Sequence, residues 1–194
     1  MTMNWKYARP IKDKLMTLEE PGGALPFDAD RRLVDEIITH YDIKALVESL
    51  KGKDEKEARQ TLKTFGSKLM ESTIELADGK YIDRTGEMVE KVARQTGISF
   101  PHRFERYVEL AILASRPTDR WSITRATTKE LVLQVSTCSL NKAMSEAGLS
   151  LPCQEMCLAC FEVASTRTGD RLDVEMTKTL PKDGMCEFTF SLRP

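Results

Sequence analysis

The feature that most constrains the fold is a change in the spacing of apolar residues near residue 118. Before it, apolar side chains recur every three or four residues, which is typical of amphipathic helices. Beyond it, several segments alternate strictly between apolar and polar residues, which is typical of half-buried strands. The sequence therefore predicts an α+β fold. We expect a helical half (30–117) packed on a small antiparallel sheet of about four strands, with two further helices (118–194).

The first half predicts a short arm followed by four helices. Residues 1–29 are rich in proline and glycine and read as an N-terminal arm, whereas 30–194 read as a single α+β domain. Asp30 is a candidate N-cap for a helix that ends at Gly52. The other helices are expected at 54–78, 85–95 and 101–115.

The second half predicts four strands and two helices. Two strands joined by a tight turn are expected at 121–126 and 131–136, and two more at 172–177 and 186–192. Helices are expected at 138–147 and 154–165, and a turn at 181–184.

Composition excludes several classes of protein. The chain has 194 residues, 41% of them hydrophobic and 30% charged, an ordinary globular balance. Its net charge of -1 provides no field that would favour nucleic acid or an anionic membrane. No apolar run approaches the length of a spanning helix, and the N-terminus does not resemble a secretory signal. We expect a cytoplasmic protein with no nucleic-acid or membrane partner.

All five cysteines lie beyond residue 137, and they are the main candidates for a functional site. An odd number of thiols in a reducing compartment argues against a disulfide framework. A helix would place three of them on one face, at i, i+4 and i+7. Thiolates bind zinc and iron–sulfur clusters, so one hypothesis is a metal site. Its candidate ligands are Cys138, Cys153, Cys157, Cys160 and Cys186. Ordinary core thiols and a reactive thiol are the two alternatives.

The C-terminal half carries a resemblance to a known family. The matching residues are the segment 135–138, the pair Cys157 and Cys160, the segment 176–180, and the ending Gly184-Met-Cys186-Glu-Phe188-Thr-Phe190. This stretch resembles the L-2-amino-thiazoline-4-carboxylic acid hydrolase family, and its ending is similar to the 4-vinyl reductase domain, a small-molecule-binding module. The resemblance implies a ligand pocket between the helices and the sheet, at which Cys138, Cys157 and Cys186 carry over.

The resemblance leaves several functions open. In the first, the protein is a hydrolase that opens a cyclic amidine C–N bond, with Cys157, Cys186 and Glu162 as candidate catalytic residues and zinc as a candidate cofactor. In the second, it is a non-catalytic ligand or metal sensor with an iron–sulfur cluster. In the third, it is an interaction module. A small-molecule ligand fits the first two, and a homodimer formed through the apolar helices is compatible with all three.

Overall fold

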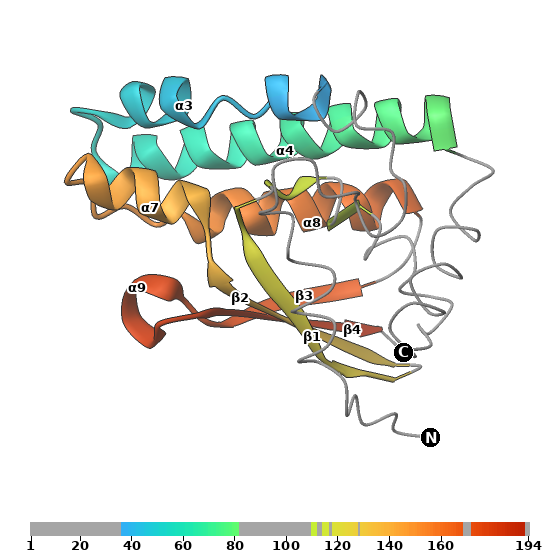
Figure 1. The fold of residues 1–194 in the computed structure, drawn as a ribbon. Helices are drawn as coiled ribbons and strands as arrows, with labels where there is room; N and C mark the ends of the chain where they lie inside the picture. The colour runs from blue at the N-terminus through green and yellow to red at the C-terminus, as the bar shows by residue number, and fades with distance from the viewer. Residues whose placement is uncertain are drawn as a thin grey trace.

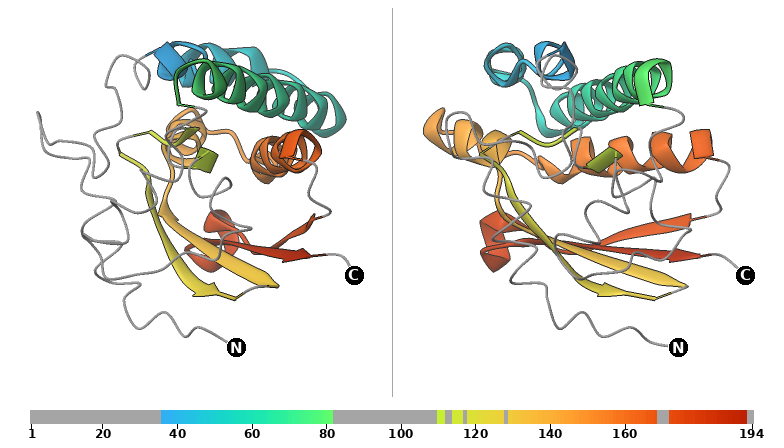
Figure 2. Two further views of the ribbon diagram at one scale, coloured as in Figure 1. Left: turned by 90° about the vertical axis from the view of Figure 1, so that its right-hand side faces the viewer. Right: turned by 45° about the vertical axis from the view of Figure 1, so that its right-hand side comes forward.

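The computed structural model describes residues 36–81, 110–111, 114–116, 118–127, 129–168 and 172–192. Two layers of helices cover one face of a four-stranded antiparallel sheet in this part of the chain (Figures 1 and 2). Helices α3 (Ile43–Leu50) and α4 (Glu55–Tyr81) form the outer layer. Helices α7 (Ser139–Glu146) and α8 (Gln154–Thr168) lie between that layer and the sheet. The predicted α+β class is confirmed.

The sheet has the order β1-β2-β4-β3, with every neighbouring pair antiparallel. Its strands are β1 (Arg120–Ala126), β2 (Glu130–Thr137), β3 (Leu172–Lys178) and β4 (Cys186–Leu192). The pairs Leu131–Phe190 and Leu133–Phe188 join the two central strands and belong to the core under the helices. Because side chains alternate along a strand, the next pair, Gln134–Glu187, faces the other way.

The predicted helix from Asp30 to Gly52 is interrupted in the structure. Residues 36–39 are helical, the chain then turns, and α3 begins at Ile43. The carboxylate of Asp42 accepts a hydrogen bond of 3.0 Å from the backbone N–H of Ala45 and so caps the new helix. The prediction of one uninterrupted helix was therefore wrong. The apolar pattern continues through Asp42, but Asp42 caps a new helix there.

Helix α4 begins with a capping box and outlasts its expected end. Asp54 accepts from the N–H of Glu57 at 2.8 Å, and the Glu57 carboxylate accepts from the N–H of Asp54 at 3.2 Å. The helix continues through the expected stop at 78–79 to Tyr81. It is polar, and no helix in the described segments is long and apolar enough to cross a bilayer.

The remaining differences are local. The expected turn at 181–184 is one helical turn, α9 (Leu180–Asp183), closed by Gly184 with φ of 71°. The arm at 1–29, the helix at 85–95 and most of the helix at 101–115 lie outside the described residues.

Helix α8 is buried on two sides, against α4 above and the sheet below (Figure 2). The Phe161 ring makes edge-to-face contacts with the rings of Phe188 and Phe190, at centroid distances of 5.4 and 4.7 Å. On the other side α8 approaches α4 at Gly66, where a β-carbon would lie 2.2 Å from the carbonyl oxygen of Met156. The two helices therefore pack at this distance only because residue 66 lacks a side chain.

Replacement of Gly66 with alanine is expected to destabilise the fold. Alanine favours a helix by about 1 kcal/mol over glycine, but the new methyl group would meet backbone that cannot rotate away. We expect a net loss of about 2 kcal/mol or more in the free energy of unfolding, measured by urea denaturation. The exposed Thr64→Ala on the same helix serves as control, with a change within about 0.5 kcal/mol. An unchanged midpoint for Gly66→Ala would contradict the close approach of α4 and α8.

Candidate functional site

A cavity of about 110 Å³ lies between the helices and the sheet. Side chains from α4, α8, β1, β2 and β4 line it, together with Tyr41 and residues between 111 and 119. Most of these side chains are apolar, among them Leu69, Trp121 and Leu133. Besides the Trp121 indole N–H, six side chains carry polar or ionisable groups, namely Tyr41, Ser115, Asp119, Cys138, Cys157 and Cys160. The site is therefore assembled from segments far apart in the chain.

The structure brings three of the five candidate thiols to this cavity. Cys157 and Cys160 reach it from α8, and Cys138 from the residue that precedes α7. The Cys160 thiol donates a hydrogen bond of 3.2 Å to the carbonyl of Gly66, so it also joins α8 to α4.

The other two thiols do not line the cavity, although both are buried. The sulfur of Cys186 accepts a hydrogen bond of 3.2 Å from the N–H of Leu180, which ties β4 to α9. Cys153 lies at the start of α8. These two cysteines pack and bond like structural residues.

Burial keeps the thiols protonated. It raises the pKa of Cys138 and of Cys160 to about 12, and that of Cys153 to about 11. Burial also raises the pKa of Cys157 and of Cys186 above the ordinary thiol value. Because the thiolate is the nucleophile and the metal ligand, these neutral thiols are poor candidates for either role at neutral pH.

Asp119 is a buried carboxylate that organises one wall of the cavity. One oxygen accepts hydrogen bonds from the backbone N–H of Ser139, at 2.6 Å, and from the Ser139 hydroxyl. The other oxygen accepts from the N–H of Arg116 at 3.0 Å. Asp119 thus serves as the N-terminal cap of α7, a task that the Cys138 side chain does not perform.

The predicted metal site is wrong. The described residues contain no group of three or more His, Cys, Asp or Glu side chains that could hold an ion. The candidate carboxylate Glu162 is exposed on α8 and does not line the cavity. The physical reason is that spacing along a helix puts thiols on one face, but burial between two apolar layers leaves them neutral.

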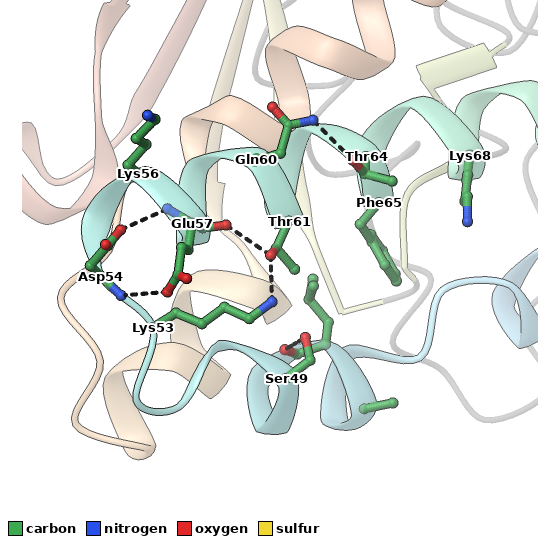
Figure 3. Close-up of a pocket in the computed structure, with 12 residues that line it drawn as sticks. Ser49, Lys53, Asp54, Lys56, Glu57, Gln60, Thr61, Thr64, Phe65 and Lys68 are labelled. Carbon is green, nitrogen blue, oxygen red and sulfur yellow. Dashed lines mark hydrogen bonds between the residues drawn. The ribbon is translucent and has the colours of Figure 1, made fainter.

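A second hollow lies between α3 and α4, and Figure 3 shows its side chains. It is a groove of about 950 Å³, and several polar side chains that line it bond to one another. Lys53 donates to Thr61 at 2.6 Å, and Gln60 donates to Thr64 at 3.3 Å (Figure 3). Since these side chains satisfy each other, the groove is a weaker candidate for a binding site than the cavity.

Comparisons with known proteins found similarity only to solved structures. No family model and no curated protein matches the chain. The NMR structure of an H-NOX domain from Shewanella oneidensis, in its Fe(II)CO ligation state, has 9% identity and a TM-score of 0.43, over 81% of this chain and 75% of that one. A mutant of the Fe(II) unliganded H-NOX protein from K. algicida has 12% identity and a TM-score of 0.45, over 97% and 93%.

These findings correct the predicted family and activity. No family model supports the aminothiazoline carboxylate hydrolase or 4-vinyl reductase resemblance, and the similar structures are H-NOX domains, so that resemblance is wrong. The hydrolase prediction is wrong with it, and so are zinc and the iron–sulfur cluster as cofactors. At these identities and TM-scores, the likeness to H-NOX domains says nothing about the ligand of this chain.

Another similar structure is described by its heme redox potential and porphyrin distortion, but haem does not fit the described residues of this chain. A cavity of about 150 Å³ holds one benzene ring, so 110 Å³ is too small for a tetrapyrrole. Of the two histidines, His40 is exposed at the turn before α3, and His102 lies outside the described residues. The thiols that line the cavity are protonated.

Two residues of the site escaped the sequence analysis. Asp119 was not among the candidate residues, because its partner Ser139 is 20 positions away. Tyr41 was assigned to the apolar face of a helix, and its place beside the interruption at Asp42 was not foreseen. The signal available for both was a polar group within or beside an apolar pattern.

The raised thiol pKa values predict a loss of stability at alkaline pH. A thiol whose pKa is higher in the folded state stabilises that state fully below its unfolded pKa near 9, and this contribution disappears as pH rises toward 12. We expect the free energy of unfolding to fall between pH 9 and 10.5 in urea titrations. Cys138→Ala is expected to reduce the slope by up to about 1.4 kcal/mol per pH unit. Equal slopes in the two proteins would contradict the buried, neutral state of Cys138.

Proposed function

We propose that this chain is a non-catalytic binding protein that senses a small, uncharged, mostly apolar molecule. The observation that carries the proposal is the cavity between the helical layers and the sheet. Its 110 Å³ compare with an engineered cavity of about 150 Å³ that binds benzene or xenon. A molecule of about five or six heavy atoms matches that space.

The charge state of the wall supports an uncharged ligand. The three thiols of the wall are neutral at pH 7 because burial raises their pKa. The Asp119 carboxylate already accepts hydrogen bonds from Ser139 and Arg116. An ion placed in this cavity would lose its hydration without gaining a free partner of opposite charge.

The absence of paired catalytic groups within the described wall supports a binding role over a reaction. A nucleophilic thiol needs a base or a cation beside it to lower its pKa, and the pKa of each thiol is raised instead. Glu162, the candidate base of the sequence analysis, is exposed and outside the cavity.

The contacts of Asp119 support a sensing role. The same carboxylate lines the cavity and holds the first N–H of α7. A ligand that shifts or stiffens this wall therefore acts directly on the start of α7. Coupling through one shared side chain is the physical link that a sensor needs between its ligand and its surface.

Cyclopentane and xenon are expected to bind the wild-type chain and raise its melting temperature. A probe at ten times its Kd stabilises by about 1.4 kcal/mol, equivalent to roughly 3–5 °C for a chain of this size. Calorimetry measures the shift, and chemical shift changes should map to residues such as Leu69, Trp121 and Phe161.

A variant that fills the cavity provides the control. Ala114→Leu adds bulk to the wall and should abolish the shift, whereas Ala45→Leu, on the exposed face of α3, should leave it unchanged. Failure of the folded wild-type chain to bind either probe would refute the proposal.

Asp119→Ala is expected to lower the free energy of unfolding by about 1–2 kcal/mol, because α7 loses its N-terminal acceptor. It should also remove the slower amide exchange that a bound probe produces at Ser139 in the wild type. Glu146→Ala, an exposed carboxylate at the other end of α7, is the matched control. Unaltered exchange at Ser139 on saturation of the wild type would refute the coupling.

We also propose a cytoplasmic location, which the five free thiols support, since they persist in a reducing compartment. A homodimer stays a prediction, and light scattering from the purified full chain measures it directly.

A further inference from the structure

The strongest unexplained polar group in the cavity wall is the hydroxyl of Tyr41. The Tyr41 side chain is 4% exposed, and it lines the cavity. Within the described part of the chain no hydrogen bond joins its hydroxyl, although a buried hydroxyl normally has a partner. An unpaired buried hydroxyl costs free energy, so its presence in this wall needs an explanation.

Among the described residues, the Tyr41 side chain borders the cavity. Arg116 Nε is the one side-chain nitrogen or oxygen in the described segments that is both fully enclosed and unbonded. The Tyr41 oxygen has no hydrogen-bond partner among the described residues and is not one of their fully enclosed unbonded atoms, and Tyr41 lines the cavity. It is therefore available to a molecule inside the cavity.

The rest of the Tyr41 residue is held firmly. Its backbone N–H donates to the carbonyl of Ile38 at 2.9 Å, and its own carbonyl accepts from the Arg116 guanidinium. The Arg116 guanidinium also lies 5.0 Å from the centre of the Tyr41 ring, and the Phe65 ring packs at 5.8 Å. These contacts fix the ring on both sides, so the direction of the hydroxyl is set before any ligand arrives.

The Tyr41 hydroxyl acts as a donor at neutral pH. Burial raises the pKa of the phenol well above its ordinary value, and the neighbouring Cys138 and Asp119 raise it further. Two other polar side chains of the wall are already engaged, since Ser115 donates to Ala111 and Asp119 accepts from Ser139 and Arg116.

We propose that Tyr41 is the polar anchor of the cavity, and that the ligand is a small uncharged molecule with one acceptor oxygen or nitrogen that receives the Tyr41 O–H. This rests on the proposed function and names its ligand class. The apolar remainder of such a molecule fills the space between α4, α8 and the sheet. A pure hydrocarbon would leave the hydroxyl unpaired and would bind without this contribution.

A matched pair of probes tests the anchor. Tetrahydrofuran and cyclopentane have the same ring size, and tetrahydrofuran replaces one methylene with an acceptor oxygen. Tyr41→Phe removes the hydroxyl and keeps the ring. We expect the variant to weaken tetrahydrofuran binding about three- to tenfold, the range of a net hydrogen bond, and to leave cyclopentane binding equal or tighter. Dissociation constants come from NMR titration of the full chain.

Control measurements separate an anchor from a structural role. Because the hydroxyl has no partner among the described residues, Tyr41→Phe should keep or raise the melting temperature, whereas loss of a structural hydrogen bond would lower it. Thr73→Val removes another buried hydroxyl, one that donates to the backbone carbonyl of Leu69; Thr73 does not line the cavity, so this variant should leave tetrahydrofuran affinity unchanged.

Each outcome decides the matter. Selective loss of tetrahydrofuran affinity in Tyr41→Phe supports the anchor. Equal tetrahydrofuran affinity in the two proteins, or equal weakening of both probes, overturns the anchor and leaves the proposed function standing. If neither probe binds the folded wild type, the proposed function fails and the anchor fails with it.

Discussion

The close contact between α4 and α8 at Gly66 determines how the described part of the molecule is layered. The missing side chain allows the Met156 carbonyl to lie against α4, and the Cys160 thiol reaches the Gly66 carbonyl across the same contact. This contact places α8 low enough for Phe161 to pack on Phe188 and Phe190 of the sheet. The space left beside it, between Leu69 on α4 and Leu133 on β2, is the cavity.

The thiols are best understood through size and polarity. A helix buried on two sides needs small apolar side chains where it meets its neighbours, and cysteine meets that need. The Cys160 thiol donates a hydrogen bond to a helix carbonyl, and the Cys186 sulfur accepts a hydrogen bond from the N–H of Leu180. Their raised pKa values follow from this packing, and the same packing argues against a metal centre at these positions.

Periodicity predicted the elements well, because the alternation of side chains is a local property of a strand. All four strands and α7 lie within one residue of their expected ends, and α8 begins where expected but ends three residues later, at Thr168. Strand order was not predictable, since β4 enters between two strands through contacts distant in sequence. The site was harder still. The spacing of the cysteines at 153–160 predicts that they share a helix face, but it does not predict the burial that keeps their thiols neutral. The cap that Asp119 provides to Ser139 joins residues far apart in the sequence, so no short motif indicates it.

The order of strands in the sheet has a consequence for synthesis. β4 is the last of the four strands in the chain, yet it pairs with β2 on one side and with β3 on the other. In a nascent chain that has emerged only as far as β3, one edge of β2 and one edge of β3 lack their partner strand. The exposed backbone groups of these edges can pair with other chains. Completion of the sheet therefore waits until the segment around Phe188 has left the ribosome. That wait makes the unfinished chain a natural client for chaperones that shield strand edges.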